Sequence, residues 1–249
     1  MRYFIEVAYD GTRYSGFQVQ ENANTIQAEV EKALSTFYGK SFALTGSSRT
    51  DTGVHALQNF FHFDTEHIIK DQHIYNLNAI LPEDIVIQNI FLVSADAHCR
   101  FQATYRKYQY FIYRKKNPFL RDQAWFYPYT LNIDLLNEAA RVITEHEDFT
   151  SFSKRNTQVK TKLCKIEESF WEIKNDQFIY TVRANRFLRG MVRGLVATML
   201  QVGRGKISVA DFINIIKAKD CSKADFSAPA HGLFLVEVGF PDIIFSSTN

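Results

Sequence analysis

The sequence predicts an α+β fold with a mainly antiparallel sheet, and not a doubly wound parallel fold. Segments with the alternating pattern of strands occur in runs, and helical segments separate these runs at uneven intervals. No strand-like segment is followed by a Gly-x-Gly-x-x-Gly turn or a P-loop lysine, so the sequence does not indicate a nucleotide cofactor. The chain has 249 residues, of which 46% are hydrophobic, enough for one large domain or two ordinary ones.

The individual elements follow from the spacing of apolar residues. Alternation predicts strands over residues 2–9, 41–46, 57–63, 85–93, 106–114, 162–173, 177–184 and 233–238. Helical spacing predicts helices over residues 26–37, 71–79, 135–143, 187–202 and 208–217. Asn24, followed three residues later by Gln27, resembles a capping box for the first helix, and Gly39 suits its end.

The two halves of the chain share a rough order of strand, loop, helix, strand and strand, which suggests a duplication. We therefore expect an N-terminal α+β domain over residues 1–105 and a C-terminal α+β domain over residues 106–249. The net charge is only +2, but residues 1–105 carry 7 Lys and Arg against 12 Asp and Glu, whereas residues 106–249 carry 22 against 15. A run without any acidic residue contains Lys154, Arg155, Lys160, Lys162 and Lys165. The second half is the one expected to face a polyanion.

The sequence indicates a cytoplasmic protein that does not enter a membrane. Its apolar stretch over residues 187–202 is interrupted by Arg189 and Arg193, so this stretch does not have the composition of a membrane-spanning helix. Residues 2–9 have the pattern of a strand and not that of a signal peptide. The three cysteines, Cys99, Cys164 and Cys221, are odd in number and form no Cys-x-x-Cys pair, which favours reduced thiols.

Asp51 lies in the stretch Ser-Ser-Arg-Thr-Asp-Thr-Gly-Val-His-Ala, residues 47–56, which connects two predicted strands. Asp, Ser, Thr and Gly are the ordinary residues of a bend, so this stretch alone favours a plain turn. The Asp-Thr-Gly triplet also occurs in aspartic proteases, but a second copy and the apolar strand before the aspartate are missing. The nearby histidines, His55, His62, His67 and His73, lack the spacing of metal ligands, and we expect no metal site.

Two further features favour an RNA ligand. Arg186, Arg189 and Arg193 recur at helical spacing around the predicted helix over residues 187–202. An arginine in such an apolar helix is costly to bury without a partner, and a carboxylate such as Asp51 would supply one. Tyr108 belongs to an aromatic strand with basic ends, whose rings either pack in the core or stack on unpaired bases.

Six stretches of the chain, in the same order, resemble the motifs of the tRNA pseudouridine synthase A family. The most specific is Ser-Arg-Thr-Asp-Thr-Gly-Val-His-Ala, residues 48–56, which is similar to the family signature Gly-Arg-Thr-Asp-x-Gly-Val-His-Ala. The others are residues 9–18, 103–110, 148–152, 184–193 and 230–235, so the resemblance covers nearly the whole chain. Ser48 stands where the family usually has glycine, Phe17 where it has tryptophan, and Arg189-Gly190 where paired histidines are frequent.

The resemblance implies a fold, an activity and an assembly. The fold would consist of two ferredoxin-like or RRM-like domains joined into one extended, mainly antiparallel sheet with a central catalytic cleft. The activity would be the isomerisation of uridine to pseudouridine at positions 38, 39 and 40 of the tRNA anticodon stem-loop. The protein would be a homodimer that contacts the anticodon arm of tRNA and needs neither a metal nor an organic cofactor.

By position, the resemblance also implies the role of each site residue. Asp51 would be the catalytic aspartate, and Arg193 would be the arginine paired with it. Tyr108 would stack on the base, and Arg49 would help to hold the displaced nucleotide. We also expect RNA contacts from Arg13, Lys154, Arg155 and Arg189. At this stage a non-catalytic RNA-binding module and, with less support, an aspartic-type hydrolase stay open as alternatives.

Overall fold

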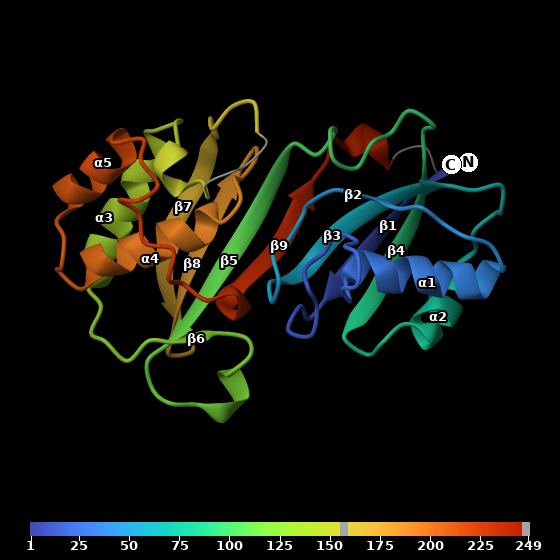
Figure 1. Ribbon diagram of the computed structural model, residues 1–249, viewed down its shortest axis with the longest axis horizontal. Coiled ribbons are helices and arrows are strands. Elements are labelled where there is room, and N and C mark those ends of the chain that lie inside the picture. Colours follow the sequence, from blue (N-terminus) through green and yellow to red (C-terminus); the bar gives the residue numbers. More distant parts are fainter. Residues whose placement is uncertain (155–158, 246–249) are drawn as a thin grey trace. The chain divides into compact units, whose positions relative to one another are not determined.

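The computed structural model describes residues 1–154 and 159–245 of the chain. These residues divide into two compact units: Met1–Thr104 together with the segment that starts at Leu235, and Tyr105–Phe234. The elements of each unit are labelled in Figure 1. Both units combine helices with mostly antiparallel strands, which confirms the predicted α+β class.

The first unit is a sheet with two helices. Its strands are β1 (Arg2–Tyr9), β2 (Thr45–Gly46), β3 (His55–Asp64) and β4 (Ile85–Val93), and its helices are α1 (Ile26–Tyr38) and α2 (Asp71–Ile80). The central strand β1 pairs antiparallel with β3 on one side and with β4 on the other. The short strand β2 pairs with β3. The last strand, β9 (Leu233–Gly239), starts in the second unit, enters the first and lies beside β3.

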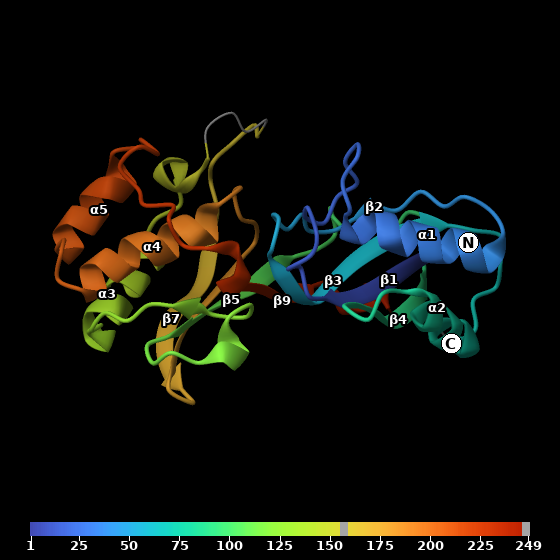
Figure 2. The ribbon, with the colours of Figure 1, turned by 60° about the horizontal axis from the view of Figure 1, so that its bottom comes forward.

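Both faces of the first sheet are covered by apolar side chains. On one face, α1 runs along β1 and β3 (Figure 2), and the Phe17 ring stacks on Phe61 with a centroid distance of 4.4 Å. On the other face, Phe60 of β3 meets Phe240 at 5.0 Å, in the segment after β9. A short 3₁₀ helix, Asp242–Ile244, ends the described part of this segment. The sheet is therefore a middle layer, which fixes the strand ends from which the connecting loops start.

The second unit contains a separate set of strands and three helices. Its strands are β5 (Tyr105–Tyr113), β6 (Trp125–Phe126), β7 (Ile166–Lys174) and β8 (Gln177–Ala184), and its helices are α3 (Ile133–Thr144), α4 (Met191–Gly203) and α5 (Val209–Lys217). Strand β8 pairs antiparallel with β5 and β7, and β6 pairs parallel with β5. Short 3₁₀ helices occur at Pro118–Leu120, Thr150–Phe152 and Ala230–Gly232.

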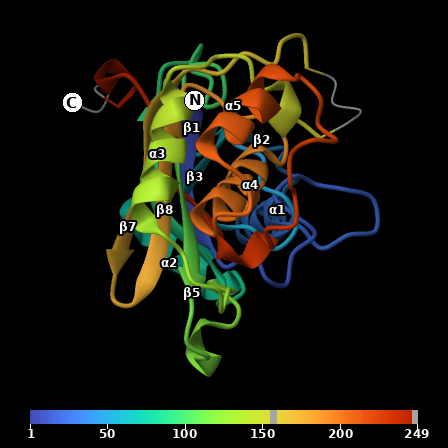
Figure 3. The same ribbon diagram turned by 90° about the vertical axis from the view of Figure 1, so that its left-hand side faces the viewer.

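The three helices of the second unit lie together over one face of its sheet (Figure 3). Tyr110 of β5 and Tyr180 of β8, which are opposite each other in the register, are both fully buried on this face. Helix α4 is almost entirely buried, which matches its apolar sequence. No helix in the described part of the chain combines the length and the apolar composition needed to cross a membrane.

Several predicted boundaries were wrong. The strand expected over residues 41–46 is only Thr45–Gly46, and the strand expected from residue 162 starts at Ile166. The helix expected from residue 187 starts at Met191, because Gly190 before it takes a left-handed φ of 76°. The cap of α1 is Thr25 and not Asn24: the Thr25 side chain accepts a hydrogen bond from Ala28 N–H.

Candidate active site

Asp51 lies on a tight turn between β2 and β3. At the start of this connection, Ser47 N–H donates to Phe60 O at 2.8 Å, so the chain leaves β2 still bonded to β3. The turn is closed by Val54 N–H, which donates to Asp51 O at 3.1 Å, and Gly53 supplies the left-handed φ of 75°. Asp51 itself is half-buried. A carboxylate in this position is partly open to solvent while its backbone is held by defined bonds.

The residue before the turn, Thr50, is held through both its backbone and its side chain. Its carbonyl accepts from Phe17 N–H at 3.1 Å, and its Oγ1 lies 2.9 Å from Tyr9 Oη. Asn59, on β3, donates from Nδ2 to Tyr9 Oη at 3.1 Å and to Ser48 O at 2.8 Å. The loop that carries the aspartate is therefore bonded to the end of β1, to the following loop and to β3.

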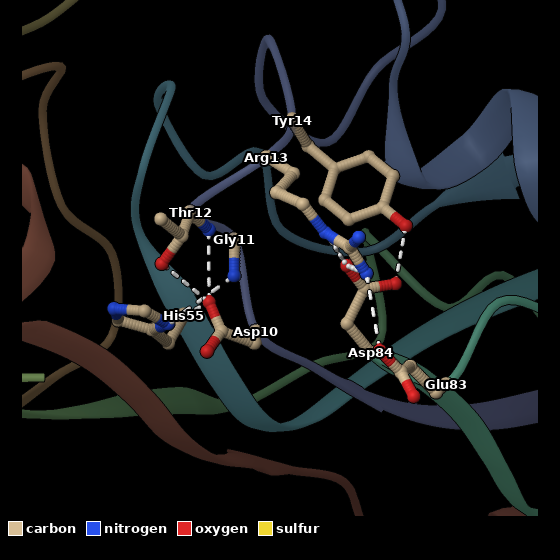
Figure 4. Close-up of polar contacts among 8 residues, drawn as sticks. All are labelled: Asp10, Gly11, Thr12, Arg13, Tyr14, His55, Glu83 and Asp84. Atoms are coloured by element: carbon tan, nitrogen blue, oxygen red, sulfur yellow. Dashed lines mark hydrogen bonds and ion pairs between the residues drawn. The ribbon is translucent and has the colours of Figure 1, made fainter. Parts of the chain in front are cut away.

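His55 ties the other end of the turn to the loop after β1 (Figure 4). The residue is 1% exposed, and its Nδ1 lies 3.2 Å from Gly11 N and 3.1 Å from Asp10 Oδ1. A neutral Nδ1 accepts from Gly11 N–H, and a protonated one donates to Asp10, so either form connects the two loops. Asp10 Oδ1 also accepts from Thr12 N–H at 2.9 Å. A Cβ at Gly11 would overlap with the carbonyl of Val54, so only glycine allows this close approach.

The next part of the same loop is anchored on Asp84 (Figure 4). Tyr14 Oη donates to Asp84 Oδ1 at 2.5 Å, and Arg13 Nε donates to Asp84 Oδ2 at 2.8 Å. Burial of the Tyr14 hydroxyl raises its pKa, and the neighbouring Asp84 raises it further. Arg13 keeps 63% of its side chain exposed, but its charge is already paired with Asp84.

Arg49 is exposed between two buried neighbours. Ser48 and Thr50 are each 7% exposed, because they face the hydrogen bonds described above. Arg49, between them, is exposed to solvent. The guanidinium is therefore accessible two residues before the candidate catalytic carboxylate.

Tyr108, in the second unit, is nearly buried at 9% exposed, and its ring meets the edge of Phe187 at 5.1 Å. Its neighbour on the same face of β5, Tyr110, is a core residue whose hydroxyl donates to Pro229 O at 2.8 Å. Burial raises the pKa of Tyr110. The two tyrosines thus have different environments.

Arg193 is the third residue of α4, and its Nε donates to Ala228 O at 2.6 Å. The prediction that it shares a helix face with Arg186 and Arg189 was wrong, because both of these residues precede Met191, where α4 begins. Arg193 is half-buried, in a helix that is otherwise apolar over most of its surface.

Lys154 and Arg189 are brought together by the backbone. Lys154 N–H donates to Arg189 O at 3.2 Å. The stem of Lys154 also packs on Gly190: a Cβ at this glycine would lie 3.1 Å from Lys154 Cγ. The Lys154 side chain therefore packs against Gly190, which belongs to the Arg189-Gly190 pair that stands where the family often has two histidines. Arg155 lies outside the described residues.

Each unit thus holds its own share of the predicted site residues. The first unit holds Arg13, Arg49 and Asp51, and the second holds Tyr108, Lys154, Arg189 and Arg193. Sequence reasoning missed the residues that hold the aspartate turn, namely Tyr9, His55 and Asn59. A signal was available for Asn59, which is an amide at the start of the otherwise apolar run Asn59-Phe60-Phe61 of a strand. His55 and Asp10 are 45 positions apart, so no local pattern in the sequence predicts their contact.

The histidines that follow Asp51 in the sequence have separate partners. His62 Nδ1 lies 3.2 Å from Cys99 Sγ, and His73 Nδ1 lies 2.9 Å from Tyr38 Oη. Within residues 1–154 and 159–245, no three His, Cys, Asp or Glu side chains are grouped as metal ligands would be.

Comparisons with known proteins agree with the motifs of the site. The family model described as tRNA pseudouridine synthase matches residues 5–105 and 141–241, one match in each half of the chain. The tRNA pseudouridine synthase A of Bacteroides fragilis is 46% identical to this chain, and the alignment covers 98% of each chain. The enzyme of the same name from Parabacteroides distasonis is 43% identical, again over 98% of each chain, and that of Staphylococcus aureus is 38% identical over 96% of this chain and 90% of its own. The family model and these near full-length similarities show that the chain belongs to the tRNA pseudouridine synthase family.

Proposed function

We propose that Asp51 is the catalytic carboxylate with which this chain converts uridine in tRNA to pseudouridine. Membership of the family makes the chain an isomerase that acts on tRNA. The observation that carries the assignment to Asp51 is its fixed turn: the residue before it is bonded to Tyr9 and Phe17, and its own carbonyl accepts from Val54. A catalytic group needs such a held backbone together with an accessible side chain.

The reaction breaks the bond between N1 of uracil and C1′ of the ribose, turns the base and joins C5 to C1′. Every atom of the nucleotide is retained, except that the proton on C5 is released to solvent while N1 gains one. Asp51 acts as an ionised carboxylate, either by adding to the sugar or the base or by removing a proton from the sugar. A uracil stacked in an RNA stem is out of reach of the carboxylate, so the nucleotide has to be flipped out, at a cost of roughly a few kcal/mol.

The other residues receive the roles that their motif positions imply. Arg49 holds the displaced nucleotide, and its exposure next to a rigid turn supports this role. Tyr108 stacks on the flipped base, and Arg193 is the cationic partner of the catalytic carboxylate. Lys154, Arg155 and Arg189 contact the RNA backbone, as does Arg13, for which we expect a smaller contribution because its charge is paired with Asp84.

The finer features of the function are part of the same proposal. The modified uridines lie in the anticodon arm, the protein is a homodimer, and it works in the cytoplasm, where its tRNA substrates are. Sedimentation of the pure protein tests the dimer, and mapping of pseudouridine in tRNA from a deletion strain tests the positions. A monomer, or unchanged pseudouridine in the anticodon arm, would contradict the corresponding part.

Replacing Asp51 with asparagine tests the central assignment. The change keeps the size of the side chain but removes the negative charge, so we expect the release of tritium from tRNA labelled at C5 of uridine to fall by more than about a thousandfold. Binding of tRNA should change little. The matched control is Asp64→Asn, which removes a carboxylate of the same unit that pairs with Arg2 on the surface. Equal rates for Asp51→Asn and the wild-type protein would remove Asp51 from the mechanism.

A further inference from the structure

We propose that Tyr9 is a positioning residue for Asp51, acting through Thr50. The proposal rests on the catalytic role proposed for Asp51. The proposed role of Tyr9 requires no contact with the substrate. The Tyr9 hydroxyl is bonded both to Asn59 of β3 and to Thr50, the residue before Asp51. These buried hydrogen bonds hold the turn in a fixed position relative to β3.

Asn59 starts this chain of hydrogen bonds, and the direction of its own bonds follows from the chemistry of the amide. The Asn59 amide nitrogen is only a donor, and its two hydrogens are directed to Ser48 O at 2.8 Å and to Tyr9 Oη at 3.1 Å. Tyr9 Oη therefore accepts from Asn59, and it shares a second hydrogen bond with Thr50 Oγ1 at 2.9 Å, in which either hydroxyl can donate. The remaining oxygen of Asn59 accepts from Phe60 N–H at 2.9 Å, which fixes the orientation of the amide. The position of Thr50 is thus fixed relative to β3.

The burial of these groups argues that the chain of bonds serves more than packing. Asn59 is completely buried, Tyr9 is 5% exposed and Thr50 is 7% exposed. Replacing bonded polar partners with apolar groups of the same shape is often nearly neutral for stability, so a core alone does not require them. Phenylalanine and valine would fill the places of Tyr9 and Thr50. The hydroxyl groups of Tyr9 and Thr50 additionally hold the backbone before Asp51 in a defined position.

The same loop braces the turn from the opposite end. Directly after Tyr9, the residues Asp10 and Gly11 contact His55, which begins the strand after the turn (Figure 4). Both ends of the turn are consequently fixed to residues 9–11, at the end of β1 and directly after it. An error of about 1 Å in the position of a catalytic group can cost about a hundredfold in rate, so a loosened end should lower kcat.

The first experiment compares Tyr9→Phe with Tyr38→Phe. Tyr38 is a matched control, because its hydroxyl also has a partner in the same unit, His73 Nδ1 at 2.9 Å, but this pair has no part in the turn. We expect kcat for pseudouridine formation to fall about tenfold in Tyr9→Phe, with KM for tRNA within about twofold of the wild-type value. Tyr38→Phe should keep the wild-type kcat even if its melting temperature falls equally. Equal kcat in the two variants would overturn the proposal.

A second set of variants tests the partner of Tyr9. Thr50→Val removes the hydroxyl at nearly constant shape and should lower kcat as Tyr9→Phe does, whereas Thr50→Ser keeps the hydroxyl and should recover most of the loss. Because both changes break the same bond, the double variant Tyr9→Phe with Thr50→Val should be no slower than either single one. Independent, multiplicative losses would contradict the relay. Asp51→Asn is measured alongside: an active Asp51→Asn rejects the proposed catalytic carboxylate, whereas an inactive one with an unimpaired Tyr9→Phe rejects only the positioning role.

Discussion

Gly11 shows how a single residue without a side chain can control the candidate site. A methyl group there would overlap with the carbonyl of Val54, and a backbone carbonyl cannot rotate away as a flexible side chain can. We expect Gly11→Ala to push the turn aside, to lower the free energy of unfolding by about 1–3 kcal/mol and to lower kcat.

Gly39→Ala is the control for this prediction. Gly39 ends α1 with a φ of 69°, and a Cβ there would meet nothing within 4 Å. The variant should lose about 1–2 kcal/mol of stability through backbone strain and keep its kcat. Urea denaturation and steady-state kinetics on both variants distinguish the two effects. A Gly11→Ala variant with the wild-type kcat would show that the close approach does not matter for activity.

His62 makes the stability of the first unit dependent on pH. Its burial lowers the pKa of the ring from 6.5 to about 4, and the adjacent ring of His98, 4.5 Å away, acts in the same direction. Between these two pH values the unfolded chain binds the proton and the folded one does not. The free energy of unfolding should therefore decrease as the pH falls from 6.5 to 4, by at most about 1.4 kcal/mol per pH unit from this group.

His62→Gln provides the measurement. Denaturation at a series of pH values between about 3 and 7 should give a shallower pH dependence above pH 4 for the variant than for the wild-type protein, because the variant has no ring to protonate. The two curves should run parallel below pH 4, where both states of the wild-type ring are protonated. Parallel curves across the whole range would show that His62 does not carry the effect.

At the scale of elements, the two units use the same device to attach a helix to an outer strand. Asn78 of α2 donates to Ile87 O at 2.8 Å and accepts from Ile87 N–H at 2.8 Å. Asn137 of α3 makes the same pair of bonds with Trp171, at 2.9 and 2.8 Å. The strands involved, β4 and β7, stand last in the strand order of their units, where unpaired backbone groups invite wrong pairing.

We expect Asn137→Ala to lower the free energy of unfolding by about 1–2 kcal/mol, because a backbone N–H and a C=O are each left without their partner. Asn78→Ala should cost a similar amount in the first unit. Asn214→Ala, at an exposed position of α5, is the control and should cost less than about 0.5 kcal/mol. Chemical denaturation followed by circular dichroism measures all three. A cost at Asn137 no larger than at Asn214 would contradict the structural role.

Three strands have the bounds that the sequence predicted. These strands, β1, β4 and β8, are each paired with a neighbouring strand from end to end. Residues 162–165 were predicted as the start of a strand but are not part of β7, since Leu163 forms an isolated bridge with Asp148 and Cys164 N–H donates to Glu147 O. The conformation of such a segment depends on residues that are distant in the sequence, and a local pattern does not reveal these residues.

The same distinction holds for the candidate site. The turn at Asp51 was predictable, because its residues are turn formers with a specific motif. The bonds that hold it were not, because Tyr9, Phe17 and Asn59 become neighbours only when β1 pairs with β3. Roles for individual residues came from the motifs, whereas the reasons for their positions came from the fold.

At the scale of the whole molecule, the charges are divided between the units more sharply than between the halves of the sequence. The first unit has 7 Lys and Arg against 14 Asp and Glu, a net charge of −7, and the second has 22 against 13, a net charge of +9. A polyanion such as tRNA is therefore attracted by the second unit and repelled by the one that carries Asp51.

Salt dependence tests this division. We expect Lys154→Ala combined with Arg155→Ala to weaken tRNA binding and to reduce the slope of log K against log salt concentration by about 0.7–0.9 for each phosphate that is no longer neutralised. Lys32→Ala combined with Lys40→Ala removes the same charge from the first unit and should leave the slope unchanged. Filter binding over a range of salt concentrations gives both slopes. Equal slopes for the wild-type protein and the Lys154 and Arg155 variant would remove these two residues from the RNA interface.

The return of β9 to the first unit determines the order in which a nascent chain can complete its parts. Thr104 is bonded through its N–H to Gly239 O at 2.8 Å, although 134 residues separate them in the sequence. While the ribosome synthesises those residues, the first unit lacks Phe240, whose ring covers Phe4 and Phe60. The first unit is thus translated first, but it can complete its fold only after the second unit has been synthesised. A chain that stopped at residue 234 would contain every candidate site residue, yet it would present the uncovered aromatic face of its first sheet to chaperones and proteases.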